Sequence, residues 1–270
     1  MFSLSGHCAL VTGGTQGVGL AMARALARAG CRMVLHTLRV DQRAEAAAEA
    51  CGASGRPAAL IAGDLSGETH AAVDQLFRKA IETEPSIDIL VNNAGTYIDV
   101  DFLEMDVARF EYTFRLNVAS GYFLTQAFAR RWIDQGTAGR VLFTGSINGL
   151  LSEPTHTAYD ASKGAVAAMV RSLCVSLAPH RIRVNSLAPG LVATPLTQPV
   201  LADPAINAWM RLHTPAGTVP SADVCGAAAV FLLSDEAEHV HGQTLLVDGG
   251  MSCWQQPDLP AALRAATANL

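Results

Sequence analysis

Two residues four positions apart, Tyr159 and Lys163, are the strongest candidates for chemistry in this chain. Val166, Met169 and Val170 follow at helical spacing, and residues four apart share one face of a helix. An ammonium beside a phenol favours the phenolate and lowers the pKa of the tyrosine, which suits it to general-base catalysis. Taken alone, the pair is better explained as an ordinary helix surface, so its neighbours decide the interpretation.

A glycine-rich turn near the N-terminus predicts a phosphate site. Segment 12–19 is Thr-Gly-Gly-Thr-Gln-Gly-Val-Gly, between an apolar strand and an Ala-rich helix. Glycines bring backbone N–H groups close to a pyrophosphate, and a helix N-terminus favours anions. The alternative is a plain turn, because the spacing differs from the commoner Gly-x-Gly-x-x-Gly motif. The position after the first strand favours dinucleotide binding, with contacts from Gly13, Thr15, Gln16, Gly17, Val18 and Gly19.

The end of the second predicted strand favours NADP over NAD. NAD sites place an Asp or Glu about 20 residues after the glycines, where it holds the ribose hydroxyls. This strand ends His36-Thr37-Leu38-Arg39, and the next acid, Asp41, is expected to cap the following helix. A 2′-phosphate therefore meets no carboxylate, and Arg39 is placed to pair with it beside Thr37. The alternative is that Arg39 is a solvated surface charge.

Composition excludes several classes of protein. The chain has 270 residues, of which 50% are hydrophobic and 16% charged, and its net charge of -5 is spread without runs. These values indicate a well-buried globular chain that binds no nucleic acid and no membrane. The N-terminus lacks the pattern of a signal peptide. The six cysteines stand singly, so we expect no metal site and a cytoplasmic location.

Strand-like and helix-like segments alternate along the chain, which predicts an α/β fold. We expect a doubly wound, Rossmann-type parallel sheet of about seven strands with helices on both faces. One domain is expected over 1–250, with a substrate-loop insertion at 191–220 and a C-terminal tail at 251–270. Strands are predicted at 7–12, 32–37, 57–62, 87–92, 139–144, 181–187 and 243–247, and helices near 17–29, 41–51, 68–83, 103–134, 157–178 and 221–234.

Together, these motifs resemble the short-chain dehydrogenase/reductase family in its single-domain form. The resemblance covers residues 6 to about 250, and the pieces occur in the family's order. Besides the glycine turn and the Tyr159–Lys163 pair, the matching pieces are Asp64-Leu65, Asn92-Asn93-Ala94-Gly95, Asn117, Ser146, Pro189-Gly190-Leu191-Val192-Ala193-Thr194 and Val247-Asp248-Gly249-Gly250.

The resemblance implies an NAD(P)-dependent enzyme that interconverts a carbonyl and a secondary alcohol. It implies Tyr159 as the general acid/base, Lys163 as its partner and a ligand of the nicotinamide ribose, and Ser146 as the residue that orients the substrate oxygen. Asn117 would hold a water that connects Lys163 to solvent. The further cofactor contacts that it implies are Asp64 and Leu65 at the adenine, and Asn93, Ala94, Gly95, Pro189, Gly190, Val192 and Thr194.

Some positions depart from the family pattern or stand outside it. Gln16 occupies a position where many relatives carry Arg or Lys, which weakens the preference for NADP. His156 lies one helical turn before Tyr159, and Trp209 lies in the insertion, so both are candidate substrate residues. The alternatives are a polar loop residue for His156 and ordinary packing of a short amphipathic helix for Trp209.

The substrate class stays open between a 3-oxoacyl thioester and a sugar or polyol. The apolar content of 195–212 slightly favours an acyl-like molecule. A catalytically idle nicotinamide-binding regulator on the same fold is the alternative function, and the intact set of Asn117, Ser146, Tyr159 and Lys163 argues against it. The family's usual assembly implies a homotetramer, in which the tail with Trp254 would reach a neighbouring subunit.

Overall fold

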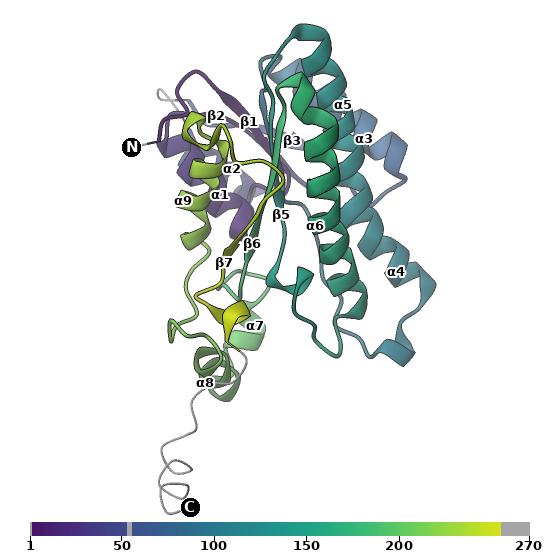
Figure 1. Ribbon diagram of the computed structural model, residues 1–270, viewed down its shortest axis with the longest axis vertical. Helices are drawn as coiled ribbons and strands as arrows, with labels where there is room; N and C mark the ends of the chain where they lie inside the picture. Colours follow the sequence, from purple (N-terminus) through teal and green to yellow (C-terminus); the bar gives the residue numbers. More distant parts are fainter. Residues whose placement is uncertain (1, 53–55, 255–270) are drawn as a thin grey trace, which may run out of the picture.

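Seven parallel strands form one sheet in the computed structural model, which describes residues 2–52 and 56–254 (Figure 1). The strand order is β3-β2-β1-β4-β5-β6-β7. The strands are β1 (Cys8–Val11), β2 (Arg32–Thr37), β3 (Ala59–Ala62), β4 (Ile89–Asn92), β5 (Arg140–Thr144), β6 (Arg183–Pro189) and β7 (Thr244–Val247). The order reverses between β1 and β4, and ligands bind beyond the carboxyl ends of the strands at such a switch point. The predicted doubly wound fold is confirmed.

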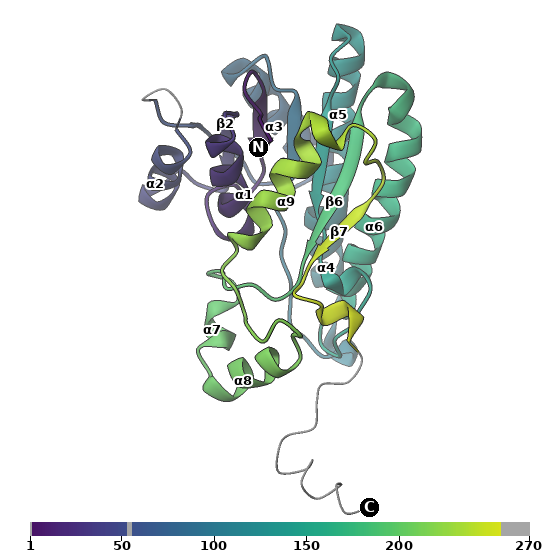
Figure 2. The same cartoon turned by 60° about the vertical axis from the view of Figure 1, so that its left-hand side comes forward.

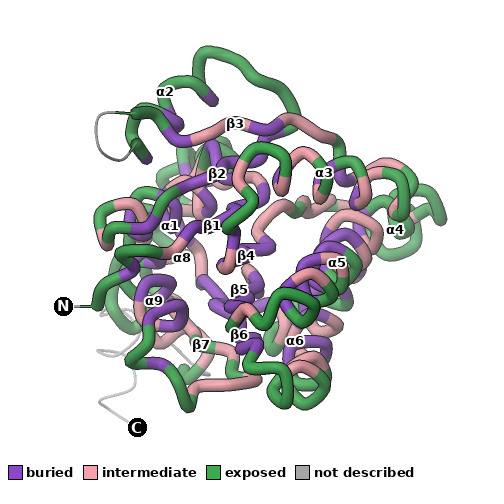
Figure 3. Tube along the Cα trace, turned by 90° about the horizontal axis from the view of Figure 1, so that it is seen from above, coloured by how far each residue is buried: buried purple, intermediate pink, exposed green. Residues whose placement is uncertain are grey.

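Helices cover both faces of the sheet (Figures 2 and 3). On one face lie α1 (Gly17–Arg28), α2 (Gln42–Ala50) and α9 (Val224–Leu233), and on the other lie α3 (Thr69–Thr83), α5 (Ser120–Gln135) and α6 (Thr157–Leu177). Alternate residues of β1 serve the two cores: Ala9 and Val11 pack with α1 and α9, while Cys8 and Leu10 pack with α3 and α5. This alternation follows from the two-residue period of a strand.

The helical stretch predicted near 103–134 is confirmed, but it starts with a separate 3₁₀ turn and contains a π-helical segment. A 3₁₀ turn at Phe102–Glu104 leads to α4 (Val107–Phe114), a π-helical segment spans Arg115–Ala119, and α5 follows. The Asp106 carboxylate accepts from the Arg109 N–H at 2.7 Å and caps α4. A π segment inserts one residue into the helical repeat and occurs often at functional sites. Here it contains Asn117.

The insertion after β6 carries two short helices, α7 (Gln198–Leu201) and α8 (Pro204–Leu212). They lie beyond the carboxyl ends of β6 and β7 (Figure 2). Asp203 caps α8 by accepting from the Ala205 N–H at 2.8 Å. A last turn at Met251–Cys253 precedes Trp254. The rest of the predicted tail, 255–270, lies outside the described residues.

One helical stretch, Thr157–His180, is long and apolar enough to cross a membrane by length and composition alone. It comprises α6 and the turn that follows. Its residues Val166, Met169 and Val170 belong to the core between the sheet and α5. The stretch is therefore a core helix of this fold.

Candidate active site

The glycine turn is built against the end of β4. The Asn93 amide donates to the carbonyls of Thr12 and Gly13 at 3.0 and 3.1 Å, and the Thr12 hydroxyl accepts from the N–H groups of Asn93 and Ala94. Gly13 and Gly17 have φ angles of +61° and +53°, a region that favours glycine. A Cβ on Gly19 would collide with the Gly13 carbonyl and the Asn93 amide. The backbone at this turn therefore requires its glycines.

This turn fits the pyrophosphate of a dinucleotide. Gln16 occupies the N-cap of α1, and its side chain makes no capping hydrogen bond. The first N–H groups of α1 therefore receive no cap from Gln16 and lie just beyond the carboxyl end of β1, as an anion site requires. The loop after β6 closes in from the other side: Thr194 approaches Gly17, and Val192 packs with Val18.

The remaining predicted cofactor residues lie along the same edge. Thr15 donates to the Thr37 hydroxyl at 3.2 Å, which joins the glycine turn to the end of β2. Arg39 follows on the exposed loop. Asp64 accepts from the Ser66 N–H and hydroxyl, and these bonds lower the pKa of its carboxyl. Leu65 is buried beside the sheet.

His36 supports the glycine turn, and the sequence analysis did not single it out. Its Nδ1 accepts from the Gly13 N–H at 3.2 Å, and its Nε2 lies 3.0 Å from the Gly63 carbonyl. These two partners require the neutral tautomer with the proton on Nε2, because Nδ1 must accept. Burial lowers the pKa of His36 to about 4. The imidazole therefore joins the carboxyl ends of β1, β2 and β3.

Tyr159 and Lys163 share one face of α6, as their spacing predicts. The Lys163 Nζ lies 5.5 Å from the centre of the Tyr159 ring and donates to the Thr144 carbonyl at 2.9 Å. Burial lowers the pKa of Lys163 to about 8. Burial also raises the pKa of Tyr159, and the nearby Ser146 opposes only part of this rise. The expectation of a lowered tyrosine pKa was therefore wrong for the protein alone, because desolvation of the phenolate outweighs the hydrogen bond from Ser146.

Asn117 is fixed on the π segment by three hydrogen bonds. Its Oδ1 accepts from the Thr96 N–H at 2.8 Å, and its Nδ2 donates to the Thr96 carbonyl at 2.8 Å and to the Ser162 hydroxyl at 3.0 Å. The residue is 7% exposed. It therefore joins the loop after β4 to the helix that carries Tyr159 and Lys163.

Ser146 lies just after β5, on the Tyr159 side of the site. Its hydroxyl accepts from the Asn148 N–H at 3.1 Å. The Asn148 amide in turn donates to Asp160 at 2.8 Å and to Glu153 at 3.1 Å. Asp160 directly follows Tyr159, so this polar network holds the loop of Ser146 against the first turn of α6.

His156 lies in an aromatic cluster with Tyr97 and Tyr159. The Tyr97 ring centre is 5.1 Å from that of His156 and 6.1 Å from that of Tyr159. Glu153 lies 3.3 Å from the His156 Nδ1 and raises the pKa of the imidazole. By contrast, Trp209 on α8 is 54% exposed, and its aromatic partner is His213 at 3.9 Å. The structure thus brings His156, but not Trp209, against the Tyr159 ring within the described part of the chain.

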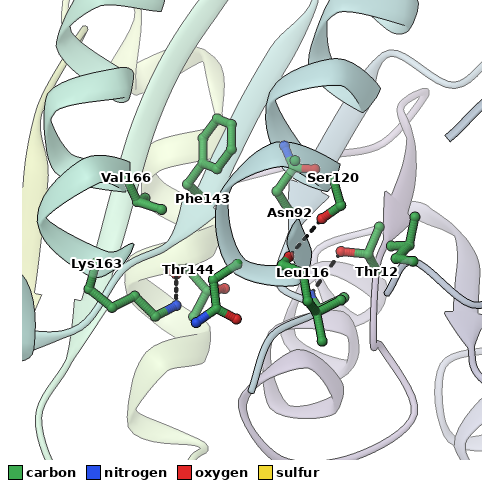
Figure 4. A pocket seen from close by; sticks show the side chains of 12 residues that line it. Thr12, Asn92, Leu116, Ser120, Phe143, Thr144, Lys163 and Val166 are labelled. Atoms are coloured by element: carbon green, nitrogen blue, oxygen red, sulfur yellow. Dashed lines mark hydrogen bonds between the residues drawn. The ribbon is translucent and has the colours of Figure 1, made fainter. Parts of the chain in front are cut away.

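A small polar cavity lies beside Lys163 (Figure 4). Lys163 reaches into it from α6, and Asn92, Asn117 and Thr144 also line it. The cavity has room for about one water molecule. The Asn92 Oδ1 is buried and has no hydrogen-bond partner among the described residues. Such a site suits the water that was expected beside Asn117, because a buried water needs several polar partners.

Sequence reasoning missed His36, Tyr97 and Thr144 because their roles depend on strands or loops that meet only in the fold. Tyr97 stands two residues after Gly95, and Thr144 two residues before Ser146. That proximity to matched motifs was the available signal.

Known proteins are similar to this chain in sequence and in fold. Residues 13–252 match the family model described as enoyl-(acyl carrier protein) reductase. An L-rhamnose 1-dehydrogenase (NAD(P)(+)) of Sphingomonas sp. (strain SKA58) is 34% identical, over 92% of this chain and 97% of that protein. A 5-keto-D-gluconate 5-reductase of Escherichia coli (strain K12) is 35% identical, over 93% of this chain and 97% of that protein. A solved gluconate 5-dehydrogenase from Burkholderia cenocepacia J2315, in complex with NADP and tartrate, matches with a TM-score of 0.87 and 33% identity, over 94% of this chain and 98% of that chain.

Proposed function

The chain belongs to the short-chain dehydrogenase/reductase family, and from this premise we propose that it is an NADP-preferring dehydrogenase of a sugar, polyol or sugar acid. Like its relatives, it is an NAD(P)-dependent oxidoreductase that acts on CH–OH groups. The observation that carries the proposal is the Tyr159–Lys163 pair at one edge of the sheet, with Ser146 and Asn117 fixed beside it.

Tyr159 is the proposed general acid/base. Bound NAD(P) supplies the nicotinamide that accepts or donates a hydride at the substrate carbon. In oxidation, the Tyr159 oxygen takes the proton of the alcohol hydroxyl while that carbon loses a hydride, which leaves a carbonyl. In reduction, Tyr159 returns the proton to the carbonyl oxygen. The raised pKa of Tyr159 keeps the phenol protonated at neutral pH, which suits it to donate in reduction.

Lys163, Ser146 and Asn117 support this proton transfer. The Lys163 ammonium, which the Thr144 carbonyl holds, stabilises a phenolate that forms on Tyr159 during oxidation. The Ser146 hydroxyl orients the substrate oxygen by a hydrogen bond. Asn117 and the water-sized cavity provide a path by which Lys163 exchanges protons with solvent.

A polyhydroxylated substrate fits the groups that surround Tyr159. Tyr97, His156 and Glu153 offer hydroxyl, imidazole and carboxylate groups on one side, and these suit hydroxyl recognition better than an acyl chain. The relatives named above act on rhamnose and 5-keto-gluconate, which favours the sugar class over the acyl thioester. We further propose that the insertion at 191–220 covers this substrate as part of a single domain over 1–250.

A substrate panel with both cofactors tests the proposal. Purified protein is incubated with sugars, polyols, sugar acids and short 3-oxoacyl thioesters, each with NAD(H) and NADP(H), and absorbance of the reduced nicotinamide is followed. We expect turnover of a polyhydroxylated compound with a higher kcat/KM for NADP. Turnover of only the thioesters would transfer the chain to the acyl class. Cofactor binding without turnover of any compound would support the idle regulator.

A Tyr159→Phe variant tests the assignment of the acid/base. It keeps the ring and removes the proton donor, so turnover should fall by roughly 10²–10⁴-fold. Cofactor binding, measured by the fluorescence of NADPH, should stay within about twofold, because the change removes only a hydroxyl. A Tyr112→Phe variant is the matched control, because Tyr112 is an exposed residue of α4. Full activity in Tyr159→Phe contradicts the assignment.

We propose a cytoplasmic homotetramer as the working form. Exposed apolar side chains lie on α4 and α5, among them Val107, Phe110, Tyr122 and Phe123. Such a surface is typical of a subunit interface. Light scattering of the purified protein should give four times the chain mass, and a Phe123→Glu variant should lower that mass. A monomer at micromolar concentration contradicts the proposal.

A further inference from the structure

A cation from α2 reaches the glycine turn. The Arg43 Nη1 donates to the Gln16 Oε1 at 2.6 Å, and the Arg43 Nη2 lies 3.4 Å from the Asp41 Oδ2. The Gln16 side chain lies in the glycine turn, carries no charge and is exposed. The guanidinium of Arg43 therefore brings a positive charge to the turn beside the neutral Gln16 side chain.

Arg39 lies on the loop between β2 and α2, and hydrogen bonds fix the backbone of this loop. The Thr37 hydroxyl donates to the Arg39 carbonyl at 3.0 Å and accepts from Thr15 at 3.2 Å. This chain of hydrogen bonds ties the backbone of Arg39 to the glycine turn. Among the described residues, the Arg39 side chain forms no ion pair, so its charge is available to a ligand.

The Asp41 carboxylate, which contacts Arg43, is already engaged. Asp41 accepts from the Ala44 N–H at 2.8 Å and caps α2, as the sequence predicted. Its contact with Arg43 is long, and both side chains are about half exposed. An exposed ion pair of this kind contributes little to the stability of the protein. Arg43 can therefore exchange Asp41 for a stronger dianionic partner without a large loss.

We propose that Arg43 is a specificity-determining residue, which binds the 2′-phosphate of NADP together with Arg39. In doubly wound folds the end of the second strand holds the ribose 2′-oxygen, and an arginine near it accommodates a 2′-phosphate. Arg43 lies between this strand end and the glycine turn, and its planar donors match phosphate oxygens. This inference rests on the proposed function, because it explains how the chain would prefer NADP although Gln16 is neutral.

Binding of cofactor fragments tests the inference without turnover. Isothermal titration compares adenosine 2′,5′-bisphosphate with 5′-AMP on the wild-type protein and on Arg43→Gln. We expect Arg43→Gln to raise the Kd of the bisphosphate about tenfold or more, because a charged hydrogen bond is lost. Binding of 5′-AMP should change less than about twofold, because it lacks the 2′-phosphate. The matched control is Arg78→Gln on α3, an exposed arginine that pairs with Asp74, and it should change neither ligand.

Two further measurements separate charge from folding and from function. Arg43→Lys keeps the charge but not the planar fork, so its bisphosphate affinity should lie between those of wild type and Arg43→Gln. If Arg43→Gln weakens the binding of both ligands equally, or does not weaken the binding of the bisphosphate, the inference is overturned. Wild-type protein that turns over a sugar but binds both fragments equally also overturns it, and leaves the dehydrogenase function standing. Wild-type protein that binds neither NAD nor NADP overturns the proposed function itself.

Discussion

Asn117 bonds both backbone groups of Thr96, as acceptor of its N–H and as donor to its carbonyl, each at 2.8 Å. The same amide donates to Ser162, whose hydroxyl donates to the Tyr159 carbonyl at 2.7 Å. One side chain thus connects the loop after β4 with the backbone of Tyr159. The π segment makes this possible, because its wider turn places Asn117 between the loop and α6.

An Asn117→Asp variant should lose stability and activity together. The aspartate has no N–H, so the Thr96 carbonyl and the Ser162 hydroxyl lose their donor inside the protein, and a buried charge is added. We expect the free energy of unfolding to fall by roughly 2–4 kcal/mol. Urea denaturation measures this fall. The control is Asn207→Asp on α8, whose amide makes a single long bond of 3.4 Å to Leu201, and a similar fall in both variants would falsify the role assigned to Asn117.

The sequence predicts the architecture well because buried parallel strands and amphipathic helices carry their own periodicity. The strand predicted at 139–144 forms at Arg140–Thr144, and the helix predicted at 157–178 forms at Thr157–Leu177. The π-helical turn at Arg115–Ala119 has no such signal, because no glycine or proline marks it. Its cause is tertiary: the bonds of Asn117 to Thr96 come from a distant loop.

The site residues are predictable as motifs, but their electrostatics are not. The four-residue spacing correctly places Tyr159 and Lys163 on one helix face. Spacing says nothing of desolvation, which raises the pKa of Tyr159 and lowers that of Lys163. Arg43 was equally hidden, because its contact with Gln16 joins residues 27 positions apart. The NADP preference and the substrate contacts stay predictions.

A Gly19→Ala variant should disturb the cofactor turn more than its size suggests. The added Cβ would collide with the Gly13 carbonyl and with the Asn93 amide, which is fixed between Thr12 and Gly13. We expect at least about a tenfold rise in the Kd of NADPH, because the turn must move to relieve the collision. The matched control is Gly164→Ala on α6, where a Cβ meets nothing within 4 Å. Unchanged NADPH binding in Gly19→Ala contradicts the close approach.

The rates of oxidation and reduction should depend on pH in opposite directions. Oxidation needs the Tyr159 phenolate, whose formation burial disfavours, so its kcat/KM should rise with pH until Tyr159 has lost its proton. Reduction needs the phenol, so its kcat/KM should fall once Tyr159 loses its proton. Removal of the cation by Lys163→Met should move the rise in oxidation to higher pH and lower its rate about 10²-fold or more.

Lys79→Met is the matched control for this pH profile. Lys79 also donates to a strand-end carbonyl, that of Ala62 at 2.8 Å, but it belongs to α3. The Lys79→Met change should remove a similar hydrogen bond and leave the pH dependence of kcat/KM unchanged. If Lys163→Met and Lys79→Met have the same pH profile, Lys163 does not act on Tyr159.

His36 should make the stability of the protein depend on pH below neutrality. Burial lowers its pKa from the ordinary histidine value of about 6.5 to about 4. Between these values the unfolded chain binds a proton that the folded chain does not, so the free energy of unfolding falls as pH decreases through this window. The full loss is roughly 3 kcal/mol, from about 1.4 kcal/mol for each pH unit. Protonation also places a donor on Nδ1 opposite the Gly13 N–H, which breaks the bond at the cofactor turn.

Urea denaturation from pH 7 down to pH 4 measures this dependence in wild type and in His36→Asn. The asparagine keeps an acceptor for Gly13 but does not titrate, so its unfolding free energy should fall less steeply than that of wild type. His70→Asn, at an exposed position of α3, controls for the loss of a histidine elsewhere and should follow the wild-type curve. Because carboxylates titrate in all three proteins, the difference between the His36→Asn and wild-type slopes isolates the imidazole. Parallel curves for these two proteins would mean that the unprotonated His36 does not hold β1, β2 and β3 together.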